Sequence, residues 1–310
     1  MIARFGLIAL VMLTWTATQA AQAVLYYCPM HPEVTAAARG KCARCGMALV
    51  AGDPYDLREY HLDVEATPPA PRAGQPFRLR LTVRHPSTNE IVNSFALVHE
   101  KPYHLFVIGQ DMESYDHIHP EQQPDGSYVI DLTLPRPGYY RLFSDFLPIG
   151  GAPQVIARVI ATAGFEGDLE SSQARLAADR TLKKTAGDLS VTLTLPSSGL
   201  VAGREETLRY QIEDARTGAP VNDVEPYLAA FGHTLVMSED TLHYVHAHPV
   251  ELLPDAVPGG PVQGGGPTLT FKALLPKPGL YRIWTQIKRH GQVSTVQFTV
   301  NVSAPATLRG

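Results

Sequence analysis

The sequence predicts a mostly β protein in which a small N-terminal hairpin precedes two tandem immunoglobulin-like β-sandwich domains. Three observations lead to this fold class: an internal repeat, segments in which apolar and polar residues alternate, and a cysteine-containing N-terminal segment that is too short for a hydrophobic core. The expected divisions are 1–23 (signal peptide), 24–52 (hairpin), 57–163 (first sandwich), 164–187 (linker) and 188–303 (second sandwich).

The N-terminal segment, residues 1–23, has the layout of a secretory signal peptide. Arg4 supplies a positive charge, an apolar run follows from Phe5 to Trp15, and the segment closes on small residues. The apolar run is shorter than the ~18 residues of a membrane-spanning helix, and no later segment reaches that length. We therefore expect a chain that is cleaved after Ala23, that is periplasmic or secreted, and that has no membrane insertion after cleavage.

The bulk composition argues against some partners and frameworks. The formal net charge is −4 at pH 7, which disfavours nucleic acid or an anionic membrane as the main partner. Three cysteines are too few, and odd in number, for a disulfide framework in an exported protein. The fold should therefore depend on hydrophobic packing, which leaves the cysteines available for another role.

An internal repeat organises most of the chain. Residues 73–120 align without a gap to residues 202–249, with 14 identities in 48 positions, too many for chance. After an insertion rich in Gly and Pro, the match resumes between residues 134–143 and 275–284. The chain is therefore a duplicated domain.

Each copy consists of short segments with a period of two. Phe77, Leu79, Leu81 and Val83 alternate with polar residues, which is typical of an antiparallel sheet with one face against a core. About seven such runs per ~100 residues indicate an immunoglobulin-like sandwich. The Gly-x-Tyr sequences that end at Tyr140 and Tyr281 resemble the tyrosine corner of that architecture. The linker could hold a short helix around Leu169–Leu182.

Three cysteines near the N-terminus have the spacing of a metal site. Cys42 and Cys45 form a Cys-x-x-Cys turn that brings two sulfurs close enough to share one ion, and a hairpin would return Cys28 as a third thiolate. Thiolates and thioethers favour Cu(I), whereas three sulfurs and an imidazole also suit tetrahedral zinc, and either metal would drive folding of this coreless segment. The alternatives are a Cys42–Cys45 disulfide with Cys28 left over, or disorder of this segment. The candidate ligands of this metal-binding hairpin are Cys28, Met30, His31, Cys42, Cys45 and Met47.

The stretches "YYCPMHPEV" and "RGKCARCGMALV" resemble the short heavy-metal-binding domain at the front of bacterial copper- and heavy-metal-transporting ATPases and of some efflux adaptor proteins. Arg39 and Ala43 stand where that family has prolines, and no metal donor is lost. The resemblance implies copper as the first candidate metal. The matching residues are Cys28, Pro29, Met30, His31, Pro32, Gly40, Cys42, Cys45, Gly46, Met47 and Leu49.

Each repeat also carries three histidines at matched positions. Residues i and i+2 of a strand point to the same face about 6.5–7 Å apart, so each His-x-His pair can direct both rings at one ion. Three imidazoles suit Cu(II) or Zn(II), and a carboxylate could orient a ring or act as a fourth ligand. A structural His–Asp network and an exposed surface position are the alternatives. The candidates are His104, His117, His119 and Asp111 in the first repeat and His233, His246, His248 and Asp240 in the second.

The leading functional hypothesis is a periplasmic metal-binding protein that sequesters an ion or delivers it to a heavy-metal efflux pump or adaptor. Copper, as Cu(I) at the cysteine cluster, is expected first, with zinc as the alternative. The repeats resemble immunoglobulin-like segments of uncharacterised exported bacterial proteins, so a tandem protein-interaction module with structural histidines is the second hypothesis. A three-histidine metalloenzyme is the third and least favoured, because no catalytic motif or general base accompanies the histidines. We therefore expect no enzyme.

Overall fold

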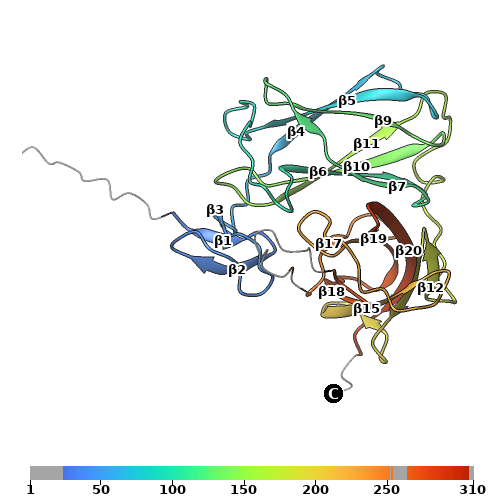
Figure 1. The fold of residues 1–310 in the computed structure, drawn as a ribbon. Coiled ribbons are helices and arrows are strands. Elements are labelled where there is room, and N and C mark those ends of the chain that lie inside the picture. Colours follow the sequence, from blue (N-terminus) through green and yellow to red (C-terminus); the bar gives the residue numbers. More distant parts are fainter. Residues whose placement is uncertain (1–23, 252, 254–263, 307–310) are drawn as a thin grey trace, which may run out of the picture.

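A computed structural model describes residues 24–251, 253 and 264–306 of the chain (Figure 1). Strands form all the regular structure of these residues, and the predicted fold class, a hairpin followed by two immunoglobulin-like sandwiches, is confirmed. The predicted signal peptide lies outside the described residues, as does most of the Gly- and Pro-rich insertion. Within the described part, no helix has the length and apolar composition needed to cross a membrane.

The N-terminal unit is a three-stranded antiparallel sheet in the order β2-β1-β3. Its strands are β1 (Tyr26–Cys28), β2 (His31–Ala36) and β3 (Val50–Ala51). An irregularity after Tyr27 shifts the register of β1 against β2, so that Cys28 pairs with His31 across the hairpin. The unit buries little apolar surface: its buried cluster consists of Cys28, Cys42 and Leu49.

The first sandwich packs two antiparallel sheets around one core. One sheet has the order β4-β5-β9-β8 and the other β11-β10-β6-β7. Alternate residues of each sheet point into the core, as the period of two predicts. The strands are β4 (His61–Thr67), β5 (Pro76–Arg84), β6 (Tyr103–Gly109), β7 (Tyr115–Ile118), β8 (Glu121–Gln122), β9 (Tyr128–Thr133), β10 (Tyr139–Phe146) and β11 (Gln154–Ala161).

The second sandwich repeats this plan, with sheets in the orders β12-β13-β15-β18 and β14-β20-β19-β16-β17. The predicted tyrosine corners are present in both copies: the hydroxyl of Tyr140 donates to the carbonyl of Arg136 at 2.8 Å, and that of Tyr281 to the carbonyl of Lys277 at 2.9 Å. The strands are β12 (Lys183–Ala186), β13 (Leu189–Thr194), β14 (Leu200–Val201), β15 (Glu205–Asp214), β16 (His233–Ser238), β17 (Tyr244–Ala247), β18 (Thr268–Leu274), β19 (Gly279–Arg289) and β20 (Gln292–Ser303).

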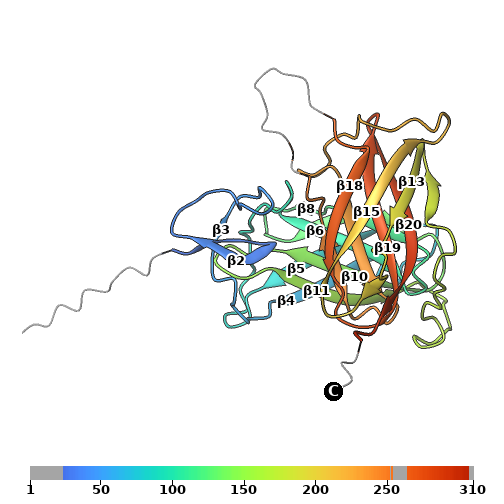
Figure 2. The ribbon, with the colours of Figure 1, turned by 90° about the horizontal axis from the view of Figure 1, so that it is seen from below.

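The two sandwiches pack against each other through the sheets that contain β6 and β16. All residues of β6 are buried, because one face of the strand lines its own core and the other faces the second sandwich. β16 is buried throughout in the same way. Figure 1 shows β6 and β7 lying toward β17 and β19, and in Figure 2, seen from below, the second sandwich lies in front of the first. The residues buried together at this interface are Phe106, Ile108, Met112, Phe143, Ala174, Leu235, Met237 and Trp284.

The contacts across the interface are nearly symmetric. Tyr115 of the first repeat stacks on Trp284 of the second, with ring centroids 4.9 Å apart, and Tyr244 of the second stacks on Phe143 of the first at 5.7 Å. The two tyrosines occupy matching positions in the repeat, and so do Phe143 and Trp284. The interface therefore resembles that of a twofold-symmetric dimer, in which the same patch is used twice, but the two copies are joined in one chain.

The linker between the sandwiches has a turn at residues 169–172 and is otherwise irregular as far as 182, so the short helix predicted around Leu169–Leu182 is wrong. Ala174 is buried in the interdomain core, and Leu176 packs against it. Their backbone amides donate to the Gln110 carbonyl and to the Glu239 carboxylate. A helix would use these amides internally and could not reach both sandwiches, so tertiary contacts override the local helix propensity.

Replacing Trp284 by Ala is expected to destabilise the protein by about 3–5 kcal/mol, because it removes a large ring from a closely packed core. Trp284 is buried and also donates from Nε1 to Gln297. Urea unfolding followed by circular dichroism measures the loss. Leu274→Ala is the control: Leu274 is exposed, so this substitution should change the free energy of unfolding little. A loss at Trp284 no larger than that at Leu274 would contradict a rigid interdomain core.

Candidate metal centres

The N-terminal unit brings three thiols and one imidazole to a single point. Sγ of Cys28 lies 3.6 Å from Sγ of Cys45, and Nδ1 of His31 lies 3.7 Å from Sγ of Cys28 and 3.6 Å from Sγ of Cys42. The four donor atoms lie within 4.8 Å of one another. Sulfurs bound at ~2.3 Å to a tetrahedral ion stand about 3.8 Å apart, whereas a disulfide requires about 2.05 Å. The cysteines are free in the structure, and their spacing suits one tetrahedral ion.

Local backbone structure explains this convergence. Gly46 donates its amide to the Cys42 carbonyl at 2.8 Å, and Cys42 donates to the Met47 carbonyl at 2.7 Å, which closes the Cys-x-x-Cys turn. Gly46 has a φ of 73°, in the left-handed region that favours glycine. The amide of Arg44 points to Sγ of Cys42 at 3.4 Å. Met30 and Met47 pack against the cluster and are partly buried.

The pKa shifts of Cys45 and Cys28 favour metal binding by these thiols. The hydrogen bond with Cys28 is the main cause that lowers the pKa of Cys45 to about 5. The same bond, together with burial, raises the pKa of Cys28. Cys45 is therefore a thiolate at neutral pH that accepts a proton shared by Cys28. A thiophilic cation in that position would bind both sulfurs.

In each sandwich the three predicted histidines converge beside the interdomain contact. β6 pairs with β7 so that Phe106 lies opposite His117, which places His104 near His119 just beyond the strand. The ring of His104 presents Nδ1 at 3.0 Å from Nε2 of His117 and 3.1 Å from Nε2 of His119. The second sandwich has the corresponding register. Each set, His104, His117, His119 and His233, His246, His248, has its ligand atoms within 4.8 Å of one another.

A backbone carbonyl fixes the orientation of the first ring of each set. Nε2 of His104 donates to the Val98 carbonyl at 2.9 Å, and Nε2 of His233 donates to the Tyr227 carbonyl at 2.9 Å. Because a carbonyl can only accept, the proton of each neutral ring lies on Nε2. Nδ1 of each ring therefore carries a lone pair, which faces the other two histidines of its set.

The second ring of each set is held by the opposite sandwich. Nδ1 of His246 hydrogen-bonds Oδ2 of Asp145 at 3.3 Å, and Nδ1 of His117 hydrogen-bonds Oε1 of Gln286 at 2.8 Å. Asp145 and Gln286 occupy the same position of the repeat, since residues 134–143 align with 275–284. Each sandwich thus supplies the outer partner of the other's histidine, with a carboxylate on one side and an amide on the other.

In the second sandwich these hydrogen bonds leave two lone pairs facing each other. Burial is the largest single influence and would raise the pKa of Asp145, but the hydrogen bonds from His246 and Tyr244 and the nearby imidazoles together outweigh it. The pKa is lowered, so Asp145 is an ionised acceptor. His246 therefore donates from Nδ1. In the neutral ring Nε2 is then a lone pair, and it stands 3.3 Å from the unprotonated Nδ1 of His233. Lone pairs at this distance repel unless a cation or an added proton lies between them.

The third ring of the second set, that of His248, also suits a metal ion. Both ring nitrogens of His248 are buried, and no hydrogen-bond partner for either is found among the described residues. A buried polar group without a partner costs about 1–3 kcal/mol. A metal ion bound by His233, His246 and His248 would give one of these two nitrogens a partner, so the residues present suit such an ion.

Burial keeps these imidazoles neutral and therefore able to bind metal. Burial, and then the neighbouring imidazoles, lower the pKa of His104 to about 4 and that of His119 to about 3. The same causes lower the pKa of His117, His233 and His248. Neutral imidazole is the form that ligates metals, so no proton has to leave these rings at pH 7.

The two sandwiches and the N-terminal unit match different family models. Residues 57–164 and 184–304 each match a domain of unknown function, DUF8832, and the two matches cover most of the chain. The chain belongs to this family. Residues 25–51 match a heavy metal binding domain, which contains all the candidate ligands of the cysteine cluster. The predicted resemblance to a heavy-metal-binding domain is confirmed, and the two DUF8832 repeats carry the histidine sets. No curated protein matches the chain.

Several solved structures resemble the chain at low sequence identity. They include the Escherichia coli adhesin FdeC (13% identity, TM-score 0.25, 78% of this chain and 64% of that chain) and Salmonella alpha-2-macroglobulin (12%, 0.26, 82% and 15%). The fibronectin(III)-like modules of Clostridium thermocellum CbhA are a third (13%, 0.23, 81% and 97%). The chain spans less than two thirds of the length of the first two.

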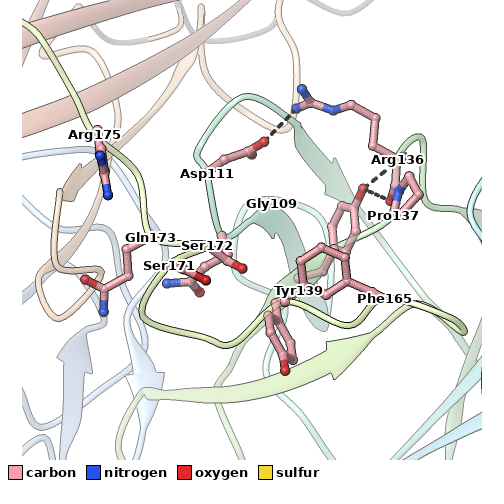
Figure 3. A pocket seen from close by; sticks show the side chains of 14 residues that line it. Gly109, Asp111, Arg136, Pro137, Tyr139, Phe165, Ser171, Ser172, Gln173 and Arg175 are labelled. Atoms are coloured by element: carbon pink, nitrogen blue, oxygen red, sulfur yellow. Dashed lines mark hydrogen bonds and ion pairs between the residues drawn. The ribbon is translucent and has the colours of Figure 1, made fainter.

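The predicted roles of Asp111 and Asp240 are wrong, because both carboxylates are engaged elsewhere. Asp111 is exposed at the end of β6, where it accepts from the amide of Glu113 and forms an ion pair with Arg136 at 3.1 Å. Figure 3 shows this pair in a surface pocket lined by residues of the first DUF8832 repeat and the linker. Asp240 accepts from Ser238 and from the amide of Leu242. Both aspartates stabilise turns, so their repetition reflects the duplicated fold.

Sequence reasoning missed three functional residues. Asp145 and Gln286 hold histidines across the interface, and His99 stacks on His248 with ring centroids 3.5 Å apart. Extending the second repeat alignment by two residues reveals the equivalence of Asp145 and Gln286. His99 has no such signal, because the second repeat has Leu228 at the matching position.

Proposed function

We propose that this protein is a periplasmic copper-binding protein that sequesters the ion or delivers it in metal homeostasis. The observation that carries the proposal is the convergence, twice, of three histidines whose ring nitrogens face one another, in a chain that also has a heavy metal binding domain. The buried, unpartnered nitrogens of His248 argue against histidines that only stabilise loops. A protein-interaction module, the second hypothesis, would not require buried histidine nitrogens without hydrogen-bond partners.

The donors assign different ions to the two kinds of centre. Three thiols and an imidazole form a soft donor set that favours Cu(I), with zinc as the alternative. The histidine sets offer three imidazoles, which suit Cu(II) or Zn(II) and also accept Cu(I). The ion is cargo in this proposal, and a heavy-metal efflux pump or adaptor is the partner that would receive it.

Metal titration of the mature chain tests the proposal. Anaerobic Cu(I) and aerobic Cu(II) and Zn(II) titrations, with elemental analysis, are expected to show one site in the N-terminal unit and one in each DUF8832 repeat. Changing His233, His246 and His248 together to Ala should remove one Cu(II) or Zn(II) ion per chain, and so should the corresponding change of His104, His117 and His119.

Single variants guard against misfolding in this test. His119→Ala and His248→Ala each remove one ligand and leave the carbonyl-bound and cross-domain rings in place. Each should weaken the site in its own repeat and leave the other unchanged, while circular dichroism stays that of the parent. Unaltered Cu(II) and Zn(II) stoichiometry and affinity in all the histidine variants would contradict metal binding by the repeats.

A further inference from the structure

A cavity of about 570 Å³ joins the N-terminal unit to the histidine set of the second repeat, through His248. It lies where the N-terminal unit meets both DUF8832 repeats, and Figure 1 shows that unit beside the two sandwiches. Its lining includes sulfur and nitrogen donors from two separate parts of the chain. The N-terminal unit contributes Met30, His31, Cys45 and Met47, and the repeats contribute His99 and His248.

The two histidines that the repeats contribute to this cavity have free, buried nitrogens. Nε2 of His99 and both ring nitrogens of His248 have no hydrogen-bond partner among the described residues. His99 is only 7% exposed and approaches both histidine sets: its ring centroid lies 5.5 Å from that of His233 and 6.3 Å from that of His104. The pair therefore stands between the cavity and the interdomain sites.

His99 is set in place by a strained turn. Its φ of 49° lies in the left-handed region, and Leu228 has a φ of 51° at the matching turn of the second repeat. The Val98 carbonyl of the same turn holds His104. Because leucine occupies this conformation in the other repeat, the backbone does not require histidine here. The imidazole is a feature of the first repeat alone, at the turn that faces the cavity.

The charges around the cavity favour a cation. Glu33, Glu205 and Glu251 line it, with Arg44 and Lys272 as the basic residues. Arg44 pairs with Glu33 and approaches Glu205 at 3.9 Å, so it also connects the N-terminal unit to the second repeat. Lys272 pairs with Glu205 at 2.8 Å, so Glu251 is the carboxylate in excess over the basic residues of this lining, and its charge favours a positive ion.

We infer that this cavity is an internal passage through which a metal ion moves from the cysteine cluster to His99 and His248, and then into the interdomain histidine sites. The inference rests on the proposed function. The ion keeps its oxidation state throughout. Bonds from the ion to thiolate sulfur break as bonds to lone pairs of neutral imidazoles form, and the released thiolates take up protons from water.

Time-resolved loading of the mature chain with Cu(I) tests the passage. Cu(I) is supplied anaerobically from a coloured chelator, whose loss of colour counts the ions bound. Copper-edge X-ray absorption on samples frozen at successive times distinguishes sulfur from nitrogen ligation. In the parent protein, ligation dominated by sulfur, with the single nitrogen of His31, should appear first, and ligation by nitrogen alone should appear later; the second is the nitrogen phase.

His99→Leu is the decisive variant, because the matching turn already accommodates leucine at Leu228. It should leave the sulfur phase unchanged and slow the nitrogen phase by about tenfold or more, the usual scale for loss of a group that supports a metal site. A Cys28/Cys42/Cys45→Ser variant should also fill its histidine sites slowly. His61→Leu, at an exposed histidine of β4, is the matched control and should load like the parent.

The outcomes separate this inference from the function on which it rests. A nitrogen phase that is slowed by His99→Leu and by loss of the cysteines, but not by His61→Leu, supports the passage. A nitrogen phase of equal rate in all four proteins would overturn the passage and leave the copper-binding function intact. Absence of the nitrogen phase in the parent would overturn Cu(I) transfer to the histidines, and the separate Cu(II) and Zn(II) titrations would then decide the function.

Discussion

Serine in place of Cys28, Cys42 and Cys45 is expected to abolish Cu(I) binding by the N-terminal unit and to leave residues 24–52 unfolded under all metal conditions. The unit has only Leu49 as a buried aliphatic side chain beside Cys28 and Cys42, so packing alone cannot offset the entropy of ordering the chain. The free energy of metal binding then becomes part of the folding free energy of the unit. In zinc-finger peptides, metal binding supplies about 10–16 kcal/mol.

Competition with a Cu(I) chelator measures the lost site, and amide hydrogen exchange measures the lost structure. Exchange in β1 to β3 should be fast in the metal-free parent, slow in the loaded parent, and fast in the serine variant with or without metal. Met30→Leu and Met47→Leu serve as controls, because these thioethers pack at the edge of the cluster and their loss should cost less than a thiolate. Retention of Cu(I) affinity by the serine variant would contradict the assignment of the ligands.

Asp145→Asn is expected to weaken metal binding at the histidine set of the second repeat by about 10–100-fold. The carboxylate accepts the Nδ1 proton of His246, which increases the electron density at Nε2 and fixes the ring. The hydroxyl of Tyr244 also donates to Asp145 at 3.0 Å, so the carboxylate is positioned by two donors from the other sandwich. The set in the first repeat, whose ring is held by Gln286, should be unaffected.

The duplication supplies a reciprocal variant. Gln286→Glu places a carboxylate beside Nδ1 of His117, so we expect tighter metal binding at the first set, by about tenfold. Zn(II) titration by calorimetry, in parents that retain only one histidine set, gives each affinity separately. Equal affinities of the two sets in the parent, unchanged by either substitution, would show that the cross-domain hydrogen bonds do not tune the sites.

Much of this architecture could be read from the sequence because it depends on local pattern. The period of two in segments such as 77–83 fixes which face of a strand meets the core, and the Gly-x-Tyr corners follow from short-range hydrogen bonds. Duplication made the matched histidines visible, and the spacing of Cys42 and Cys45 defines a turn with two sulfurs. These features involve residues that are near in the chain or copied within it.

The sequence alone determined the duplicated β-sandwich, the cysteine cluster and the identity of six histidines that converge in two sets. Only the tertiary structure decided that the two sandwiches face each other, that Asp145 and Gln286 exchange partners across the interface, and that His99 joins His248 beside the cavity. It also removed Asp111 and Asp240 from the sites. The physical reason is that β6 and β16 are buried on both faces. The surface that covers the second face of each strand is decided by packing between the two sandwiches. Residues in contact there, such as His246 and Asp145, are more than 100 positions apart in the chain, so no local period encodes this contact.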